Sequence, residues 1–259
     1  MRVLVGAALM AVTITPVTTV RAQQSEDQRL CAAATGVSSE QKLDSCTAVI
    51  KAGHATPQNL AVAFNNRGNA HLNLKDYDLA IADYDRAIER NPKFAIAFNN
   101  RGTAYRSKGR YDRAVHDYDR AIEISPGYAV AFFGRGLAYQ NKAQWDFDAY
   151  LNEGRYEDLA IRDYDEAIRL NPKNAAAFNN RGNIHVSQRK YDRAIQDFDE
   201  ALRLNPDNVL YLRNRGNAFR VTGQYRSAIA DYRRALSLKI DDPSRKQVEV
   251  ALKELGVAN

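Results

Sequence analysis

The five-residue sequence Phe-Asn-Asn-Arg-Gly occurs at residues 64–68, 98–102 and 178–182. Each copy carries two side-chain amides, which both donate and accept hydrogen bonds, and one arginine, which can pair with a carboxylate. Such groups hold polar main chain or tie helices together. They do not provide a nucleophile or a general base, so the pattern indicates recognition or structure and not covalent chemistry.

The three copies belong to a longer repeat with a period of 34 residues. Positions are numbered 1–34 within each repeat. Glycine occupies position 8 of every copy, alanine occupies positions 20 and 27, and aromatic residues predominate at positions 4 and 24. The repeats span 61–94, 95–128, 129–174, 175–208 and 209–240, and the third is longer by twelve residues.

Each repeat is predicted to form two helices. Apolar residues recur at helical spacing over positions 1–14 and again over positions 18–30, and proline at position 32 ends the second helix in the first four repeats. The small residues at positions 8, 20 and 27 predict a close approach of the two helix axes, with aromatic rings filling the space around it. One such hairpin cannot bury its own apolar face, so the units must stack.

This pattern resembles the tetratricopeptide repeat family over residues 61–240. The resemblance implies an all-α fold, a right-handed superhelical solenoid of antiparallel helix pairs with five repeat units and a capping helix at each end. It also implies that the first helix of each pair lines a concave groove in which peptides or partner proteins bind.

Asparagine is frequent on the side of the first helix that such a superhelix turns toward its groove. At 100° per residue, positions 2, 5, 6, 9, 12 and 13 lie opposite the core face. Asparagine is a mediocre helix former, so a column of amides there suggests contact with the main chain of an extended peptide. Asparagine at position 6 is similar to the ladder of O-linked N-acetylglucosamine transferases, which grips substrate backbone. Inheritance by duplication is the alternative explanation.

We therefore predict a partner-binding groove of polar residues interrupted in the third repeat. There, Phe133, Gly134 and Leu137 form an apolar stretch that could anchor a ligand side chain. The predicted groove residues are Asn65, Asn66, Asn69, Asn99, Asn100, Arg106, Phe133, Asn179, Asn180, Asn183, Arg213, Asn214, Asn217 and Arg220.

Arginine at position 7 and aspartate at position 23 recur in all five repeats. Position 7 lies at the edge of the core face, where a cation needs a partner. We predict structural ion pairs that fix helix registry, within a repeat or between neighbours. The arginines are Arg67, Arg101, Arg135, Arg181 and Arg215, and the aspartates are Asp83, Asp117, Asp163, Asp197 and Asp231.

Residues 1–22 have the pattern of a cleaved secretory signal peptide. A basic start is followed by an uncharged, mostly apolar run and by Val20-Arg21-Ala22, which is typical of a cleavage site. An uncleaved anchor is the alternative; after cleavage no stable membrane insertion is expected. We predict an exported protein, periplasmic or secreted. Removal of these residues lowers the net charge from +6 to +4, and no basic stripe indicates nucleic-acid binding.

The regions flanking the repeats are predicted to be caps. Cys31 and Cys46 form an even pair in an exported chain, which indicates a disulfide. Residues 23–60 are expected to form a disulfide-pinned capping helix, with a capping box at Ser38 and Gln41, and a linker ending in a cap at Thr56-Pro57. Residues 241–259 are expected to form a C-terminal capping helix.

The insertion in the third repeat contains Trp145, Phe147 and Tyr150. Their spacing fits an extension of the first helix. They could also form an aromatic knob that contacts a partner or a second copy of the chain.

No catalytic constellation, metal site or cofactor motif is recognisable. The histidines stand without a nucleophile or a second ligand nearby, and nucleotide-binding and hydrolase motifs are missing. We predict a non-enzymatic scaffold that binds a peptide or partner protein in the concave groove. One alternative is a component of an envelope or secretion assembly that uses the convex face and the insertion; another is a glycan- or wall-binding module. Self-association is possible in either.

Overall fold

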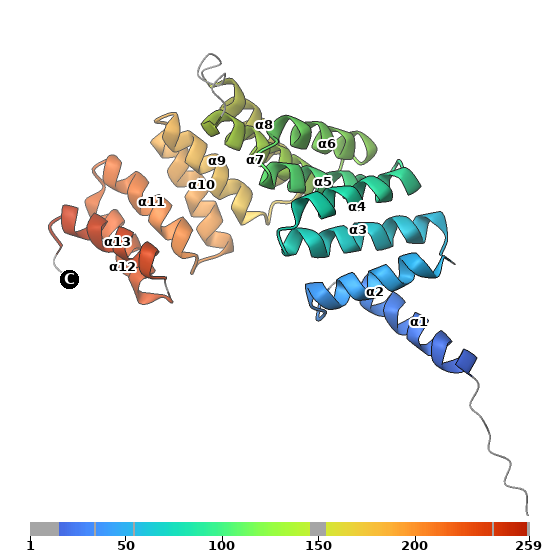
Figure 1. The fold of residues 1–259 in the computed structure, drawn as a ribbon. Helices are drawn as coiled ribbons and strands as arrows, with labels where there is room; N and C mark the ends of the chain where they lie inside the picture. The colour runs from blue at the N-terminus through green and yellow to red at the C-terminus, as the bar shows by residue number, and fades with distance from the viewer. Residues whose placement is uncertain (1–15, 34, 54, 146–153, 240, 258–259) are drawn as a thin grey trace, which may run out of the picture. The chain divides into compact units, whose positions relative to one another are not determined.

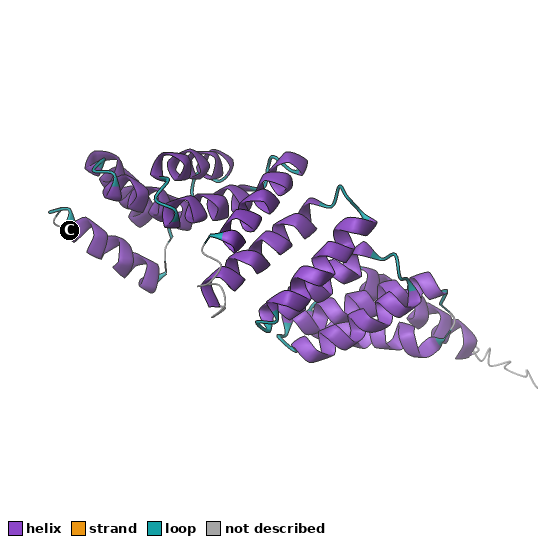
Figure 2. Ribbon diagram, turned by 90° about the horizontal axis from the view of Figure 1, so that it is seen from above, coloured by secondary structure: helices purple, strands orange, loops and turns teal. Residues whose placement is uncertain are grey.

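The computed structural model describes residues 16–33, 35–53, 55–145, 154–239 and 241–257. Within these ranges the regular structure consists of thirteen α-helices, with no strand (Figures 1 and 2). Over residues 16–90 and 111–254, each helix packs against the next in sequence. The prediction of an all-α fold built from consecutive helix pairs is confirmed.

The chain divides into two compact units, residues 1–100 and 101–259. Unit 1 contains α1 (Pro16–Ala32), α2 (Ser39–Ala52), α3 (Pro57–Asn73), α4 (Tyr77–Arg90) and the first residues of α5 (Ala95–Ser107). In this unit α2 packs against both α1 and α3, and α1 also contacts α3.

Unit 2 contains the remainder of α5 and eight further helices, in which each helix from α6 to α12 packs against the next. They are α6 (Tyr111–Ile124), α7 (Ala129–Trp145), α8 (Arg155–Leu170), α9 (Ala175–Ser187), α10 (Tyr191–Leu204), α11 (Val209–Val221), α12 (Tyr225–Ser237) and α13 (Asp242–Glu254).

Helix boundaries follow from capping residues in the sequence. The capping box at the start of α2 is formed on both sides, since the Ser38 hydroxyl accepts from the Gln41 amide and the Gln41 side chain accepts from the Ser38 amide. Thr56 caps α3, with proline at the first helical position. Asp241 caps α13.

The centre of each helix pair is a ring packed on a glycine. The position-24 rings of Tyr84, Tyr164 and Phe198 are fully buried. A Cβ atom added to Gly68 would lie 2.7 Å from the Tyr84 ring, and one added to Gly182 would lie 2.8 Å from the Phe198 ring. Position 8 is therefore glycine because the neighbouring ring occupies the space of any side chain.

The N-terminal region differs from the expectation of a single capping helix. Two helices, α1 and α2, precede the first repeat. In sequence, residues 16–32 resemble the end of a signal peptide followed by a linker, so the first of these helices was not predicted. The Sγ atoms of Cys31 in α1 and Cys46 in α2 are 2.10 Å apart, which makes the two cysteines a disulfide.

The first helix of the third repeat is longer than the first helices of repeats two, four and five, as its spacing indicates. α7 has 17 residues, whereas α5, α9 and α11 have 13 each. Phe147 and Tyr150 lie outside the described residues. The aromatic knob therefore stays a prediction.

Candidate partner-binding site

The position-7 arginines clamp the second helix of their own repeat. In each repeat Nε and one terminal nitrogen donate to both carboxylate oxygens of the position-23 aspartate. The Arg67–Asp83 bonds are 2.8 and 2.7 Å, and the Arg215–Asp231 bonds are 2.8 and 2.6 Å. The same bidentate geometry joins Arg101 to Asp117, Arg135 to Asp163 and Arg181 to Asp197.

The third nitrogen of Arg67, Arg135, Arg181 and Arg215 reaches a residue of the preceding helices. Nη1 of Arg181 donates to Asp165 at 2.5 Å, and Nη1 of Arg215 donates to Asp199 at 2.7 Å. Arg135 reaches Asp119 in the same way, whereas Arg67 donates to the Thr47 hydroxyl of α2. One guanidinium thus ties its own hairpin together and ties it to the one before. The sequence left open whether the ion pairs form within a repeat or between neighbouring repeats, and both kinds of pair occur.

These clamps are buried enough for desolvation to matter. The Asp163 carboxylate is nearly inaccessible, and burial raises its pKa although Arg135 opposes the shift. The pair therefore holds its charges at a substantial desolvation cost, and either partner left alone would be a stranded charge.

The position-5 asparagines are not open to a ligand. Asn65, Asn99 and Asn179 are 3–5% exposed, and each donates from its side-chain amide to the carbonyl oxygen of the position-6 asparagine that follows it. The angular projection of one isolated helix placed them on an open face. That projection does not include the hydrogen bonds that Asn65 and Asn179 accept from the next first helix.

The position-6 asparagines continue this network into the preceding repeat. Asn100 Nδ2 donates to Asn65 Oδ1 at 3.0 Å and to Asn69 Oδ1 at 3.0 Å. Asn214 Nδ2 donates to Asn179 Oδ1 at 2.9 Å. The amides thus form a ladder between first helices, here called the asparagine ladder. Much of the hydrogen-bonding capacity of the repeated motif is used inside the fold.

Replacing Asn214 by alanine is expected to lower the free energy of unfolding by about 1–3 kcal/mol, because the buried Asn179 carbonyl oxygen loses its donor. Urea denaturation measures the change. Asn183→Ala is the matched control, since Asn183 is half-buried on α9 outside these ladder bonds, and we expect a change below about 0.5 kcal/mol. Equal effects of the two variants would contradict the structural role of the ladder.

The remaining predicted groove residues differ in how many of their side-chain contacts are made within the fold. Asn69 and Asn217 accept from the buried hydroxyls of Tyr84 and Tyr232. Phe133 packs on the Tyr164 ring, with ring centroids 5.8 Å apart, and so belongs partly to the core. Asn66 and Asn180 are half-buried and accept from the preceding asparagine, and Asn66 also donates to the main-chain oxygen of Cys31.

Three of the predicted groove residues are arginines, and two of them are covered by the last helix. Arg213 donates to Gln247 and Arg220 forms an ion pair with Glu254, both on α13. Arg106 occupies the same repeat position as Arg220, but position 12 of the next first helix is Gln140 and not a carboxylate. The Nε atoms of Arg106 and Arg220 are both buried without a hydrogen-bond partner among the described residues, so what distinguishes the two arginines is the carboxylate that reaches Arg220.

Arg106 lies next to tyrosine hydroxyls. Burial raises the pKa of the Tyr118 phenol, and hydrogen bonding with Thr103 and the nearby Arg106 opposes that shift. Burial also raises the pKa of Tyr164, again with Arg106 opposing. These interactions hold the guanidinium among polar groups without neutralising its charge.

An exposed aliphatic residue stands at position 2 of four first helices. In unit 1 these are Val62 and Ile96, and in unit 2 they are Val130, 53% exposed, and Leu210, 44% exposed. Positions 2, 6, 9, 12 and 13 lie on one side of a helix, called here the first-helix face. Position 2 lies on this face by its helical angle, but its aliphatic residues are not among the groove residues predicted from the sequence.

Histidine and acidic residues in the described ranges give no catalytic or metal-binding arrangement. His185 is buried on α9, 3.8 Å from Asp197, and burial lowers its pKa. No group of three or more His, Cys, Asp or Glu side chains in the described part of the chain is placed to hold a metal ion. Among the described helices, none is long and apolar enough to cross a membrane.

The comparison with protein families decides the identity of the fold. The model of the tetratricopeptide repeat matches residues 65–129, 147–208 and 180–244, which together make up more than half of the chain. The chain belongs to the tetratricopeptide repeat family. None of the curated proteins matches it.

Solved structures of tetratricopeptide repeat proteins share the fold. The structure of pilF from Pseudomonas aeruginosa has a TM-score of 0.67 at 15% sequence identity, and the match covers 89% of this chain and 98% of that one. TTC0263 of Thermus thermophilus has a TM-score of 0.60 at 22% identity, with 74% and 98% covered. YrrB, described as having an unusual peptide-binding site, has a TM-score of 0.55 at 19% identity, with 78% and 96% covered.

Proposed function

We propose that this tetratricopeptide repeat protein is a non-enzymatic scaffold that binds an extended peptide along the first-helix face. Within unit 2, a carboxylate of the peptide pairs with Arg106, and aliphatic side chains of the peptide lie on Val130 and Leu210. The observation that carries the proposal is the distribution of charge between first and second helices.

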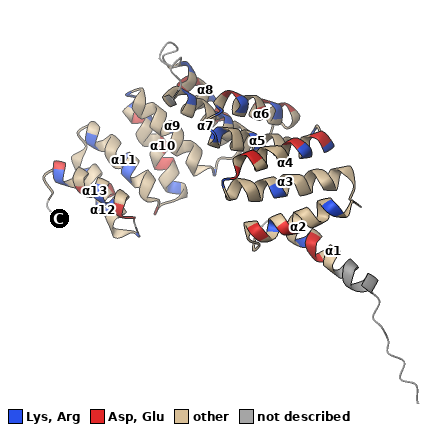
Figure 3. Ribbon diagram, viewed as in Figure 1, with Lys and Arg blue, Asp and Glu red and all other residues tan. Residues whose placement is uncertain are grey.

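The first helices contain no acidic residue. None of α3, α5, α7, α9 and α11 carries an aspartate or a glutamate, whereas α4, α6, α8 and α10 each carry several. Figure 3 lets the reader follow this along α3, α4 and α11. The position-7 arginines are paired with second-helix aspartates, whereas Arg106 is a first-helix cation without a carboxylate on its own helix, which favours an acidic partner.

The difference between the partners of Arg220 and Arg106 indicates which chemical group of a ligand would bind at Arg106. At the last repeat the chain supplies its own carboxylate, Glu254, one period after Arg220. No described residue offers Arg106 a carboxylate in this way. A carboxylate from a partner would therefore form with Arg106 the same kind of ion pair that Glu254 forms with Arg220. The half-buried site strengthens such a charge-assisted pair over one in bulk water.

Replacing Arg106 by glutamine is expected to weaken binding of an acidic peptide at least about tenfold, because one charge-assisted pair contributes roughly 1.5–3 kcal/mol. The probe is a fluorescein-labelled peptide of alanine and leucine with one central glutamate, and anisotropy measures its affinity. Its glutamine twin should bind more weakly to the wild type and equally to both proteins.

Arg169→Gln is the control variant, since Arg169 is an exposed arginine on the second helix α8. It removes the same charge and should leave the affinity unchanged. An equal loss with both variants would reduce the effect to net charge and contradict a specific role of Arg106.

We further propose that the chain is exported and loses residues 1–22. The Cys31–Cys46 disulfide supports an oxidising compartment. Cleavage would shorten α1 to Gln23–Ala32, which keeps Cys31. Edman sequencing of the protein from the exported fraction should begin at Gln23; a sequence beginning at Met1 would contradict cleavage.

A further inference from the structure

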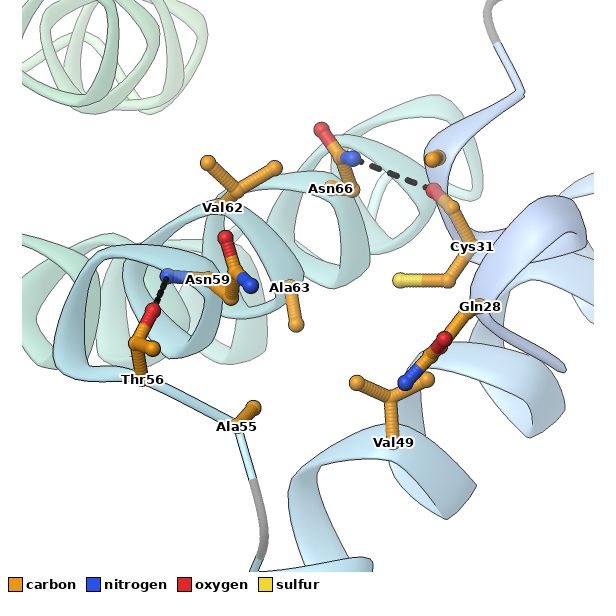
Figure 4. A pocket seen from close by; sticks show the side chains of 10 residues that line it. Gln28, Cys31, Val49, Ala55, Thr56, Asn59, Val62, Ala63 and Asn66 are labelled. Atoms are coloured by element: carbon orange, nitrogen blue, oxygen red, sulfur yellow. Dashed lines mark hydrogen bonds between the residues drawn. The ribbon is translucent and has the colours of Figure 1, made fainter. Parts of the chain in front are cut away.

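A cavity of about 320 Å³ lies beside the disulfide in unit 1, between α1 and α3 with α2 beneath (Figure 4). Its apolar lining includes Val49, Ala55, Val62 and Ala63, and the amide side chains of Gln28 and Asn59 stand on its α1 and α3 sides. The volume is within the range of pockets that bind small groups.

The cavity exists because α1 takes the place of a preceding repeat without filling it. Asn66 Nδ2 donates to the main-chain oxygen of Cys31 at 3.0 Å, across 35 residues. The ladder bonds from Asn100 to Asn65 and from Asn214 to Asn179 span the same 35 residues. The Cys31 carbonyl thus acts as the missing position-5 asparagine, and α1 ends one residue later.

The chemistry of the lining defines the ligand. Among the described residues that line this cavity, none has a charged side chain. Such a lining disfavours phosphate, carboxylate or ammonium groups, because a charge there would be desolvated without a partner. An adjoining hollow of about 50 Å³ shares Gln28, Val49 and Ala55 and continues the apolar floor over Ala48 and Ala52. Asp27 of α1 also lines this hollow, and its carboxylate disfavours an anionic ligand there.

We propose that this cavity is a second docking site, which takes an uncharged aliphatic side chain of an extended partner peptide while Gln28 and Asn59 hydrogen-bond its main chain. The site stands on unit 1 alone and does not depend on the Arg106 site. It accepts neutral segments, whereas the Arg106 site selects acidic ones.

The disulfide makes the site conditional on oxidation. Gln28, Cys31 and Ala32 form the α1 side, and the Cys31–Cys46 bond joins α1 covalently to α2. Without this bond α1 is attached through side-chain packing and the Asn66 hydrogen bond. Reduction should therefore weaken the α1 side of the site while leaving α3 and α4 packed on each other.

The test uses acetyl-leucine-N-methylamide as the probe, with acetyl-aspartate-N-methylamide as its charged counterpart, and ¹⁵N NMR of the disulfide-bonded chain. We expect saturable shifts of the Gln28 and Asn59 side-chain amide signals with the leucine probe, with Kd on the order of 1–10 mM for so small a ligand. The aspartate probe should cause none.

Val62→Asp should weaken binding of the leucine probe at least fivefold, since it places a charge at the rim. Ile96→Asp is the matched control, because it stands at the same repeat position and the two side chains are 41% and 45% exposed; it should bind as the wild type does. Reduction of the wild type should abolish the shifts while the Tyr84 signals stay in place.

Equal shifts with both probes, wild-type binding by Val62→Asp, or unchanged binding after reduction would each overturn the proposal.

Discussion

Replacing Arg181 by methionine is expected to lower the free energy of unfolding by about 3–5 kcal/mol. Arg181 holds both oxygens of Asp197 at 3.0 and 2.5 Å, and Asp197 is about 5% exposed. Methionine keeps most of the side-chain volume but leaves the Asp197 carboxylate buried without its cation. Urea denaturation followed by circular dichroism measures the loss.

Two further variants separate the buried pair from the exposed arm of the same clamp. Asp165→Asn removes only the contact to the preceding hairpin, where the carboxylate is half exposed, and should cost below about 1 kcal/mol. The double variant Arg181→Met with Asp197→Leu should recover most of the loss, because no charge is then stranded. A double variant as unstable as Arg181→Met would contradict this explanation.

Replacing Phe198 by alanine is expected to cost about 3–5 kcal/mol, because the ring is completely buried and its loss leaves a cavity at the centre of the α9–α10 pair. Gly182→Leu should also be destabilising by itself, since its Cβ would lie 2.8 Å from the Phe198 ring. The same denaturation experiment measures both.

The two substitutions should compensate when combined. In the double variant the leucine enters space that the ring has vacated, so the total loss should be smaller than the sum by more than about 1 kcal/mol. If the two losses of unfolding free energy were strictly additive, the Phe198 ring and a side chain at position 182 would not compete for the same space, which would contradict this explanation.

Repetition explains which features could be predicted from the sequence. The glycine at position 8 and the ring at position 24 recur at a fixed offset, and so do Arg181 and Asp197 and their counterparts. Each offset fits two antiparallel helices in contact, so the helix pairs could be predicted without coordinates. The capping residues Ser38 and Thr56 similarly accept hydrogen bonds from main-chain amides only a few residues later, so they can be predicted from local sequence.

Features that depend on the neighbouring repeat could not be predicted in this way. Asn65 and Asn179 look like groove residues on a single helix, and only the adjacent first helix buries them. The helical state of Gln23–Ala32 depends on packing against α2 and on the disulfide, and no periodic signal in that segment indicates it. The distinction between Arg106 and Arg220 requires knowing that Glu254 reaches one of them.

The most direct test of the proposed function is a crystal structure of the chain with the glutamate-containing peptide bound. The account predicts an extended peptide on the first-helix face of unit 2, with its carboxylate about 2.7–2.9 Å from the Arg106 guanidinium. A peptide bound to the second helices, or a carboxylate placed away from Arg106, would contradict it.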